Sequence, residues 1–190
     1  MPAKLVYDIF PLRGVVPKWK PQLDAAKAML AASDPDIKVT AEIGKFQWFS
    51  QKDGIGEKKK PSMGAMPPGK SAAKDYRYHQ DQKDLLNHKM LADKKLGPEP
   101  GHIPVVWADS FSTGELGETV NPAVWDSTYV GRSGLFMSNA SVGNKHTLLH
   151  ETGHLAGIAH DEGTANELMN AWPGTTLTRA HKQTIESAAF

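Results

Sequence analysis

Apolar and polar residues alternate along this chain with two different periods, and each period predicts a different kind of segment. In residues 4–10 and again in residues 37–43, apolar side chains stand at every second position. A period of two predicts a strand with one buried face. Pro11 is expected to end the first of these strands, because proline removes a backbone donor.

Helical spacing marks three other segments. From residue 18 to about residue 32, apolar residues recur at steps of three and four, which predicts an amphipathic helix. Residues 72–96 are largely polar with scattered apolar positions, and they predict a second helix. Residues 177–190 predict a C-terminal helix, with Thr176 or Thr178 near its start.

Short apolar runs predict the remaining strands. Residues 103–107 form a run without alternation, which suits a central strand buried on both faces. Residues 134–138 predict the last strand before another helix, which we expect from about residue 144 to residue 156. Ser141 or Asn144 could cap that helix, because both side chains can accept a hydrogen bond from a free backbone amide.

The whole-chain counts limit the class of protein. A length of 190 residues fits one domain over residues 1–190 and is enough to bury a core. Lys and Arg number 22 against 21 Asp and Glu, so no attraction to nucleic acid or to an anionic membrane is indicated, and we expect a monomer. The chain has no cysteine, which leaves His, Asp and Glu as metal ligands.

The N-terminal residues do not resemble an export signal. Residues 1–8 carry charges among their apolar positions, and no apolar run in the chain approaches the length of a membrane span. Two alternatives stay open. The protein could lack a conventional signal and be secreted by a non-classical route or translocated as an effector, or a signal could have been removed.

The strongest chemical pattern is a pair of histidines one helical turn apart. His150 and His154 are four residues apart, so on a helix both imidazoles stand on one face and can bind one metal ion. Glu151 follows His150 directly, which turns its side chain about 100° round the helix. From there it can reach a water molecule on the metal without being a ligand, as a general base must.

A third histidine completes the predicted metal site. Gly157 can end the helix in a left-handed conformation, and this sharp turn would bring His160 back to the same ion. Three nitrogen ligands leave a fourth position open for water, which is typical of catalytic rather than structural zinc sites. The sequence therefore predicts Zn²⁺ bound by His150, His154 and His160.

These five fixed positions resemble the extended zinc signature of the metzincin clan of metallopeptidases. The clan also has a methionine in a tight turn beneath the metal, and Met169 resembles it. Asp161 resembles an aspartate of adamalysin-like members, whereas the segment before His150 is equally similar to small bacterial matrixin-like enzymes, so the subfamily stays open. Ala171 stands where astacin-like and serralysin-like members have a tyrosine ligand, and no such ligand is expected.

The resemblance implies an α+β fold. It would be a metzincin-like catalytic domain with a twisted mixed sheet of about five strands, an antiparallel edge strand, a zinc-site helix and a C-terminal helix. Residues 116–122, Leu-Gly-x-x-x-x-Pro, resemble the edge strand above the cleft of small matrixin-like enzymes. Gly157, Asp161 and Met169 would support the site structurally.

The implied activity is that of a zinc-dependent endopeptidase. In such enzymes a zinc-bound water attacks the peptide bond, and Glu151 would act as general base and then as general acid. A protein or peptide is the expected partner, since an edge strand can pair with an extended chain.

Two other functions remain open from the residues alone. In an aminopeptidase-like zinc hydrolase, the third ligand would be a glutamate further along the chain, either Glu167 or Glu186. In a non-catalytic zinc-containing module, the edge strand would capture a peptide without cleaving it. Loss of the general base would favour this second alternative, yet Glu151 is present.

Overall fold

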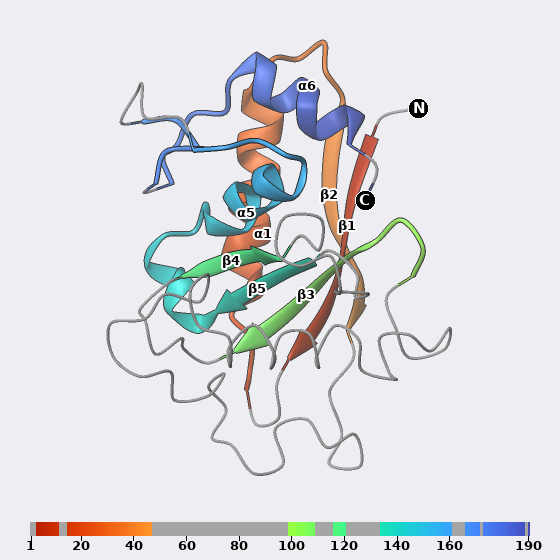
Figure 1. Ribbon diagram of the computed structural model, residues 1–190, viewed down its shortest axis with the longest axis vertical. Coiled ribbons are helices and arrows are strands. Elements are labelled where there is room, and N and C mark those ends of the chain that lie inside the picture. The colour runs from red at the N-terminus through yellow and green to blue at the C-terminus, as the bar shows by residue number, and fades with distance from the viewer. Residues whose placement is uncertain are drawn as a thin grey trace, which may run out of the picture.

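The computed structural model of the chain describes residues 3–11, 15–46, 99–108, 116–120, 134–160, 166–171, 173–188 and 190. Within them, five strands and three α-helices form an α+β fold (Figure 1). The fold class expected from the sequence is confirmed. The helix expected over residues 72–96 lies outside the described residues, and so does Asp161.

The five strands form one mixed sheet in the order β2-β1-β3-β5-β4. Their bounds are β1 Ala3–Pro11, β2 Val39–Phe46, β3 Ile103–Ala108, β4 Gly117–Val120 and β5 Gly134–Ser138. All neighbouring strands pair in parallel except β4, which pairs antiparallel with β5 at the edge. The sheet therefore has the antiparallel edge strand that the resemblance implied.

In the described part of the chain, three α-helices pack on this sheet. Their bounds are α1 Trp19–Ala32, α5 Thr147–Leu155 and α6 Arg179–Ser187, and a short 3₁₀ helix, η3 Asn139–Gly143, precedes α5. Helix α1 contacts β2 and α5, and α5 contacts β4 and β5 (Figure 1). No described helix is long and apolar enough to cross a bilayer.

The start of α5 differs from the prediction. The helix begins at Thr147 rather than near residue 144, because residues 144–146 form a turn between the 3₁₀ helix η3 and α5. Ser141 does not cap α5, since its hydroxyl donates to the carbonyl of Ser138 at 2.6 Å. Asn144 is not the cap residue either, since the cap position is His146, but it contacts the helix start twice. Its side-chain oxygen accepts from the amide of His146 at 3.1 Å, and its backbone carbonyl accepts from the amide of Thr147 at 3.3 Å.

The C-terminal helix α6 is shorter than expected but begins as predicted. It spans Arg179 to Ser187, and Thr178 caps it by accepting from the amide of His181 at 3.2 Å. Lys182 on this helix is buried, and its ammonium donates to three carbonyl oxygens at the end of α1, at 2.7 to 3.0 Å. This ammonium therefore supplies donors to carbonyls that helix α1 leaves free at its C-terminus.

Strand β1 is buried on both faces, which corrects the expectation of one exposed face. Every residue from Leu5 to Pro11 is buried. The physical reason is position: β1 lies between β2 and β3, and internal strands of a parallel sheet are covered on both sides. Tyr7 and Phe10, from opposite faces of the strand, are both among the largest fully buried side chains.

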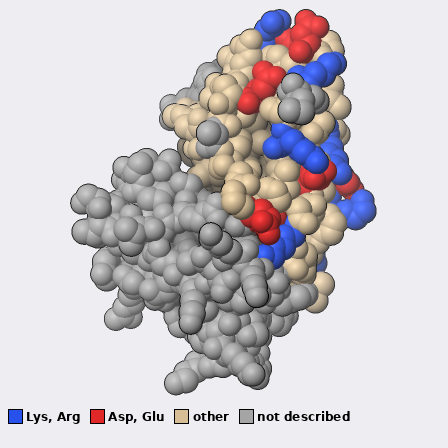
Figure 2. All heavy atoms as spheres, turned by 90° about the vertical axis from the view of Figure 1, so that its right-hand side faces the viewer, with Lys and Arg blue, Asp and Glu red and all other residues tan. Residues whose placement is uncertain are grey.

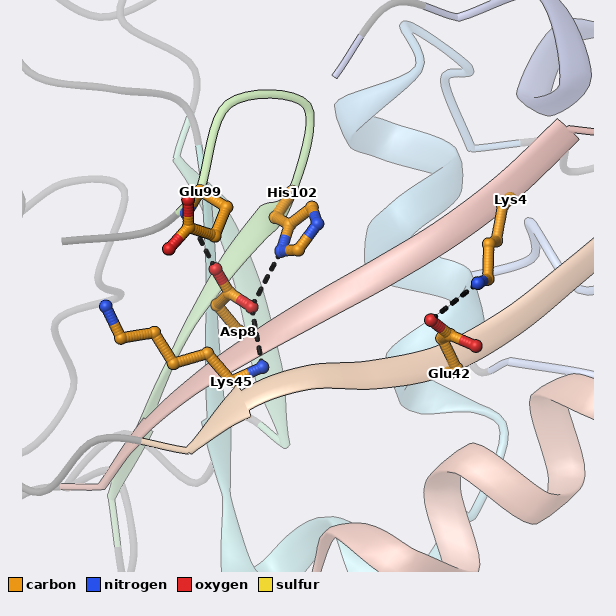
Figure 3. Close-up of polar contacts among 6 residues, drawn as sticks. All are labelled: Lys4, Asp8, Glu42, Lys45, Glu99 and His102. Atoms are coloured by element: carbon orange, nitrogen blue, oxygen red, sulfur yellow. Dashed lines mark hydrogen bonds and ion pairs between the residues drawn. The ribbon is translucent and has the colours of Figure 1, made fainter. Parts of the chain in front are cut away.

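A buried carboxylate on β1 joins three segments of the chain. Asp8 accepts hydrogen bonds from the backbone amides of Lys45 and Glu99, at 2.8 and 2.9 Å, and it contacts Nδ1 of His102 at 2.9 Å (Figure 3). Both carboxylate oxygens are thus occupied by nitrogen atoms. The end of β2 is thereby tied to the residues that lead into β3.

The surface carries both signs of charge. On the face drawn in Figure 2, basic and acidic side chains of the described residues are interspersed, with no extended area of one sign. An exposed ion pair between Lys4 and Glu42, at 2.7 Å, is one example (Figure 3). Exposed pairs of this kind add little stability because water and salt screen them.

Candidate metal centre

Helix α5 presents two imidazoles on one face, as its spacing predicted. The Nε2 atoms of His150 and His154 lie 3.0 Å apart. His150 is buried and His154 is half-buried. The two side chains therefore bring their Nε2 atoms together on one face of the helix.

A left-handed glycine ends the helix and returns the chain to this site. Gly157 has a φ of +89°, a conformation that side chains with a Cβ atom rarely adopt. Its amide donates to the carbonyl of His154, and the amide of Ile158 donates to that of Gly153, both at 2.9 Å. These two hydrogen bonds form a Schellman motif, which supports the predicted role of Gly157 as the helix terminator.

The turn brings His160 to the other two histidines. Its Nε2 lies 3.0 Å from Nε2 of His154 and 3.4 Å from Nε2 of His150. The three nitrogen atoms thus form a compact triangle, and the three side chains form a group that could hold a metal ion. The sequence predicted these three histidines, and the structure brings them together.

Hydrogen bonds fix the tautomers of two of the histidines. Nδ1 of His150 lies 2.6 Å from the carbonyl oxygen of Leu168, and Nδ1 of His154 lies 2.7 Å from that of Ile158. A carbonyl oxygen only accepts, so each Nδ1 must carry the proton in the neutral ring. Each Nε2 then presents a lone pair toward the centre of the triangle, an arrangement that a cation would stabilise.

The separations within the triangle fit a zinc ion. Nitrogen ligands at about 2.0 to 2.1 Å from zinc in tetrahedral geometry lie roughly 3.3 Å from one another. The observed separations are 3.0, 3.0 and 3.4 Å. The donor set also suits zinc, for which neutral imidazole is a common ligand.

Burial keeps the helix histidines neutral. It lowers the pKa of His150 to about 4, although the hydrogen bond to Leu168 acts in the opposite direction, and the neighbouring histidines lower the pKa further. Burial also lowers the pKa of His154. Neutral imidazoles are the form that binds metal, so the site favours metal binding over protonation.

Glu151 follows His150 on helix α5 and is not part of the histidine group. The residue is buried, with 6% of its surface exposed, and burial raises the pKa of its carboxyl to about 7. A hydrogen bond from Thr119 at 2.8 Å lowers the pKa by a smaller amount. A carboxyl with a pKa near neutrality can both accept and release a proton at physiological pH.

Met169 lies directly beneath helix α5. It is fully buried, and a Cβ atom added to Gly153 would lie 2.4 Å from its sulfur. Gly153 is thus a residue that the sequence analysis missed. Its signal was a glycine inside a helix, which costs stability and indicates a close approach by another group.

The segment that carries Met169 is held by its own backbone. The amide of Leu168 donates to the carbonyl of Thr176 at 2.7 Å, and the amide of Gly174 donates to that of Glu167 at 3.1 Å. Gly174 has no room for a Cβ atom, which would lie 2.2 Å from the carbonyl oxygen of Asn166. This closed loop presents the Leu168 carbonyl to His150.

Gln22 of helix α1 holds the start of the metal-site helix, and sequence reasoning missed it. Its amide nitrogen donates to the carbonyls of Ser141 and Asn144, at 2.6 and 3.0 Å. Its amide oxygen accepts from the backbone amide of Leu148 at 3.0 Å. The sequence signal for this role is a glutamine at the apolar spacing of an amphipathic helix. Its full burial and its partners are set by the tertiary structure.

The two glutamates considered as alternative ligands lie apart from the histidine group. Among the described residues, the group that could hold a metal contains His150, His154 and His160 and neither Glu167 nor Glu186. Glu186 is exposed on α6. The described part of the chain therefore favours a three-histidine site.

Comparison with known proteins adds a likeness in fold. No protein-family model matches the sequence, and no curated protein matches it. The fold is similar to the crystal structure of metalloproteinase-II from Bacteroides fragilis, with a TM-score of 0.57 and 16% sequence identity. The match covers 97% of this chain and 52% of that one, so the chain spans about half the length of the solved structure.

Proposed function

We propose that this protein is a zinc-dependent endopeptidase of the metzincin type. The observation that carries the proposal is the convergence of three imidazole Nε2 atoms, 3.0 to 3.4 Å apart, together with a buried carboxyl on the residue after His150 that is not part of the group. A site that served only to bind zinc structurally would need a fourth protein ligand and no separate carboxyl. The likeness in fold to a metalloproteinase supports the same proposal.

His150, His154 and His160 would hold the zinc ion. When bound, zinc polarises a carbonyl group and lowers the pKa of water in contact with it. The carbonyls of Leu168 and Ile158 keep two of the imidazoles in the tautomer that presents Nε2. These backbone contacts orient the two imidazoles even without a bound metal.

Glu151 would move the proton. As the oxygen of water bonds to the carbonyl carbon of the substrate, the carboxylate of Glu151 accepts the proton that this oxygen loses. The carboxyl then delivers the proton to the amide nitrogen as the carbon–nitrogen bond breaks. A pKa near 7 suits both steps, because the group can take and return a proton with little cost at neutral pH.

The edge strand β4 would bind the substrate. Its backbone pairs with β5 on one side, and it packs against the metal-site helix. An extended polypeptide could pair with the other side of β4 through main-chain hydrogen bonds, which do not depend on sequence. The proposed substrates are therefore proteins or peptides.

A peptide-library cleavage experiment tests the proposal. Zinc-loaded protein should cleave peptides detectably by mass spectrometry, a chelator should stop cleavage, and added zinc should restore it. Glu151→Gln should reduce cleavage by at least about 100-fold, the usual share of a general base, while bound zinc stays at the wild-type level. Glu186→Gln, on the exposed face of α6, is the matched control and should cleave as the wild type does.

The outcome also separates the alternatives. A zinc-loaded wild type that binds peptides and cleaves none would favour the non-catalytic binding module. Release of single N-terminal residues alone would favour an aminopeptidase. Cleavage by Glu151→Gln at the wild-type rate would overturn the proposed mechanism.

A further inference from the structure

One hydroxyl group on the edge strand contacts Glu151 twice. Oγ1 of Thr119 lies 2.8 Å from Oε2 of the Glu151 carboxyl and 2.7 Å from the backbone carbonyl oxygen of the same residue. Both distances are typical of hydrogen bonds between a hydroxyl and an oxygen acceptor. The contact joins strand β4 to helix α5 through two residues that are 32 positions apart in sequence.

Strand β4 comes close to helix α5 at Gly117, which has no side chain. A Cβ atom added to Gly117 would lie 2.9 Å from Thr147 and 3.0 Å from Cγ of Glu151. Residues two apart on a strand point to the same side, so Gly117 and Thr119 both face helix α5. The glycine lets the strand come close enough for the threonine hydroxyl to reach the carboxyl.

We propose that Thr119 is a positioning residue for the Glu151 carboxyl, an inference that rests on the proposed function. A hydroxyl has one proton to donate and can also accept. When Glu151 is a carboxylate, Thr119 can donate to Oε2. When Glu151 carries the proton, the carboxyl can donate to Oγ1, and the hydroxyl can turn its own proton to the Glu151 carbonyl.

This arrangement keeps the Glu151 side chain hydrogen-bonded both as a carboxylate and as a protonated carboxyl. A general base that later acts as an acid must change form once in each turnover, and a buried group that loses its partner is costly. Thr119 avoids this cost without moving, because only its hydroxyl proton rotates. The contact also fixes the Glu151 carboxyl relative to β4, the strand proposed to bind the substrate.

Paired substitutions at one position test the role. Thr119→Val keeps the shape of the side chain and removes the hydroxyl, whereas Thr119→Ser keeps the hydroxyl and removes the methyl group. We expect Thr119→Val to lower kcat by about 10- to 100-fold, because the Glu151 carboxyl loses the contact that orients it. KM should stay within about twofold of the wild-type value, because strand β4 can still bind the substrate. Thr119→Ser should restore most of kcat.

A control and a metal content measurement accompany these variants. Thr184→Val also removes a hydroxyl that bonds to a backbone carbonyl, but it lies exposed on α6. It should leave kcat and bound zinc unchanged. Thr119→Val should also retain wild-type zinc, which separates a misplaced base from a lost metal.

A second measurement needs no activity. In metal-free protein, the shifts in Tm caused by Thr119→Val and Glu151→Ala should be non-additive in the double variant, because each change removes the same contact. If zinc-loaded wild type cleaves nothing, the proposed function fails, and this coupling alone decides whether Thr119 holds Glu151. Additive shifts, an unchanged kcat in Thr119→Val, or no rescue by serine would each overturn the inference.

Discussion

Nδ1 of His150 lies 2.6 Å from the carbonyl oxygen of Leu168, the residue directly before Met169. This contact ties the metal-site helix to the loop beneath it. Because the acceptor is a backbone carbonyl, its position depends on the path of the loop and not on the side chain at position 168. The orientation of a predicted ligand is thus set by a segment 18 positions away in sequence.

Zinc should stabilise the protein through the histidine triangle. At free zinc about 100 times the Kd, binding to the folded state alone adds about 2.7 kcal/mol. For a chain of this size, that corresponds to a rise in Tm of roughly 5 to 10 °C. Calorimetry with zinc and with a chelator measures the effect.

His160→Ala tests whether the third histidine belongs to that site. The variant should lose most of the zinc-dependent rise in Tm, because only two protein ligands remain. His181→Ala, on α6 and outside the histidine group, should keep it. Full zinc affinity in His160→Ala would instead favour a glutamate as third ligand.

Gly153→Ala should destabilise the protein through Met169. The added methyl group would lie 2.4 Å from a fully buried sulfur, so the methionine or the helix must shift. Overpacking of this kind costs about 1 to 3 kcal/mol. Urea denaturation measures the loss.

Gly143→Ala is the matched control, since nothing lies within 4 Å of its added Cβ atom. It should change the free energy of unfolding by no more than about 0.5 kcal/mol. Shortening the methionine, in Gly153→Ala combined with Met169→Ala, should cost less than the sum of the two single changes. Equal losses at positions 143 and 153 would contradict the steric argument.

Asp8→Asn should be costly although the change is small. Both carboxylate oxygens face nitrogen donors, so one of the donors would meet the new NH₂ group and lose its acceptor. An unsatisfied buried donor costs about 1 to 3 kcal/mol. Glu42→Gln removes a carboxylate whose ion pair is about half exposed, and it should cost less than about 1 kcal/mol. Thermal unfolding of both variants compares them.

Glu151 should make metal-free protein less stable as the pH rises. Its pKa is raised from 4.5 to about 7 on folding, so the folded state holds the proton more tightly than the unfolded state. This contribution is fully present below about pH 4.5 and is lost as the pH rises through about 7. The amide side chain that Glu151→Gln introduces does not titrate, so this variant should not show that loss of stability.

The comparison between the two proteins isolates this one group, since the histidines titrate in both. In the presence of a chelator, Glu151→Gln should gain stability relative to wild type with rising pH, by at most roughly 3 kcal/mol between about pH 4.5 and about pH 7. Urea denaturation across this range measures it. A difference that stays constant with pH would show that the carboxyl is not held in its neutral form by burial.

Local patterns in the sequence were enough to predict several parts of the fold. The periods of apolar residues located β1, α1 and the C-terminal helix, and the residues before Pro122 marked the edge strand by resemblance. The limits of α5 were less well predicted. The turn over residues 144–146 and a hydrogen bond from the amide of Leu148 to the side-chain oxygen of Gln22 mark where that helix begins, and neither leaves a periodic signal.

The histidine group was predictable because the spacing of His150, His154 and His160 is a local property of a helix and the turn that ends it. What orients those histidines and the carboxyl of Glu151 was not predictable, because the Leu168 carbonyl and the Thr119 hydroxyl come from distant segments. The sequence alone determined which side chains could meet a metal ion. Only the tertiary structure decided which ring nitrogens face a carbonyl oxygen, how far these side chains are buried and that burial raises the pKa of the Glu151 carboxyl, since these depend on which groups surround them in space.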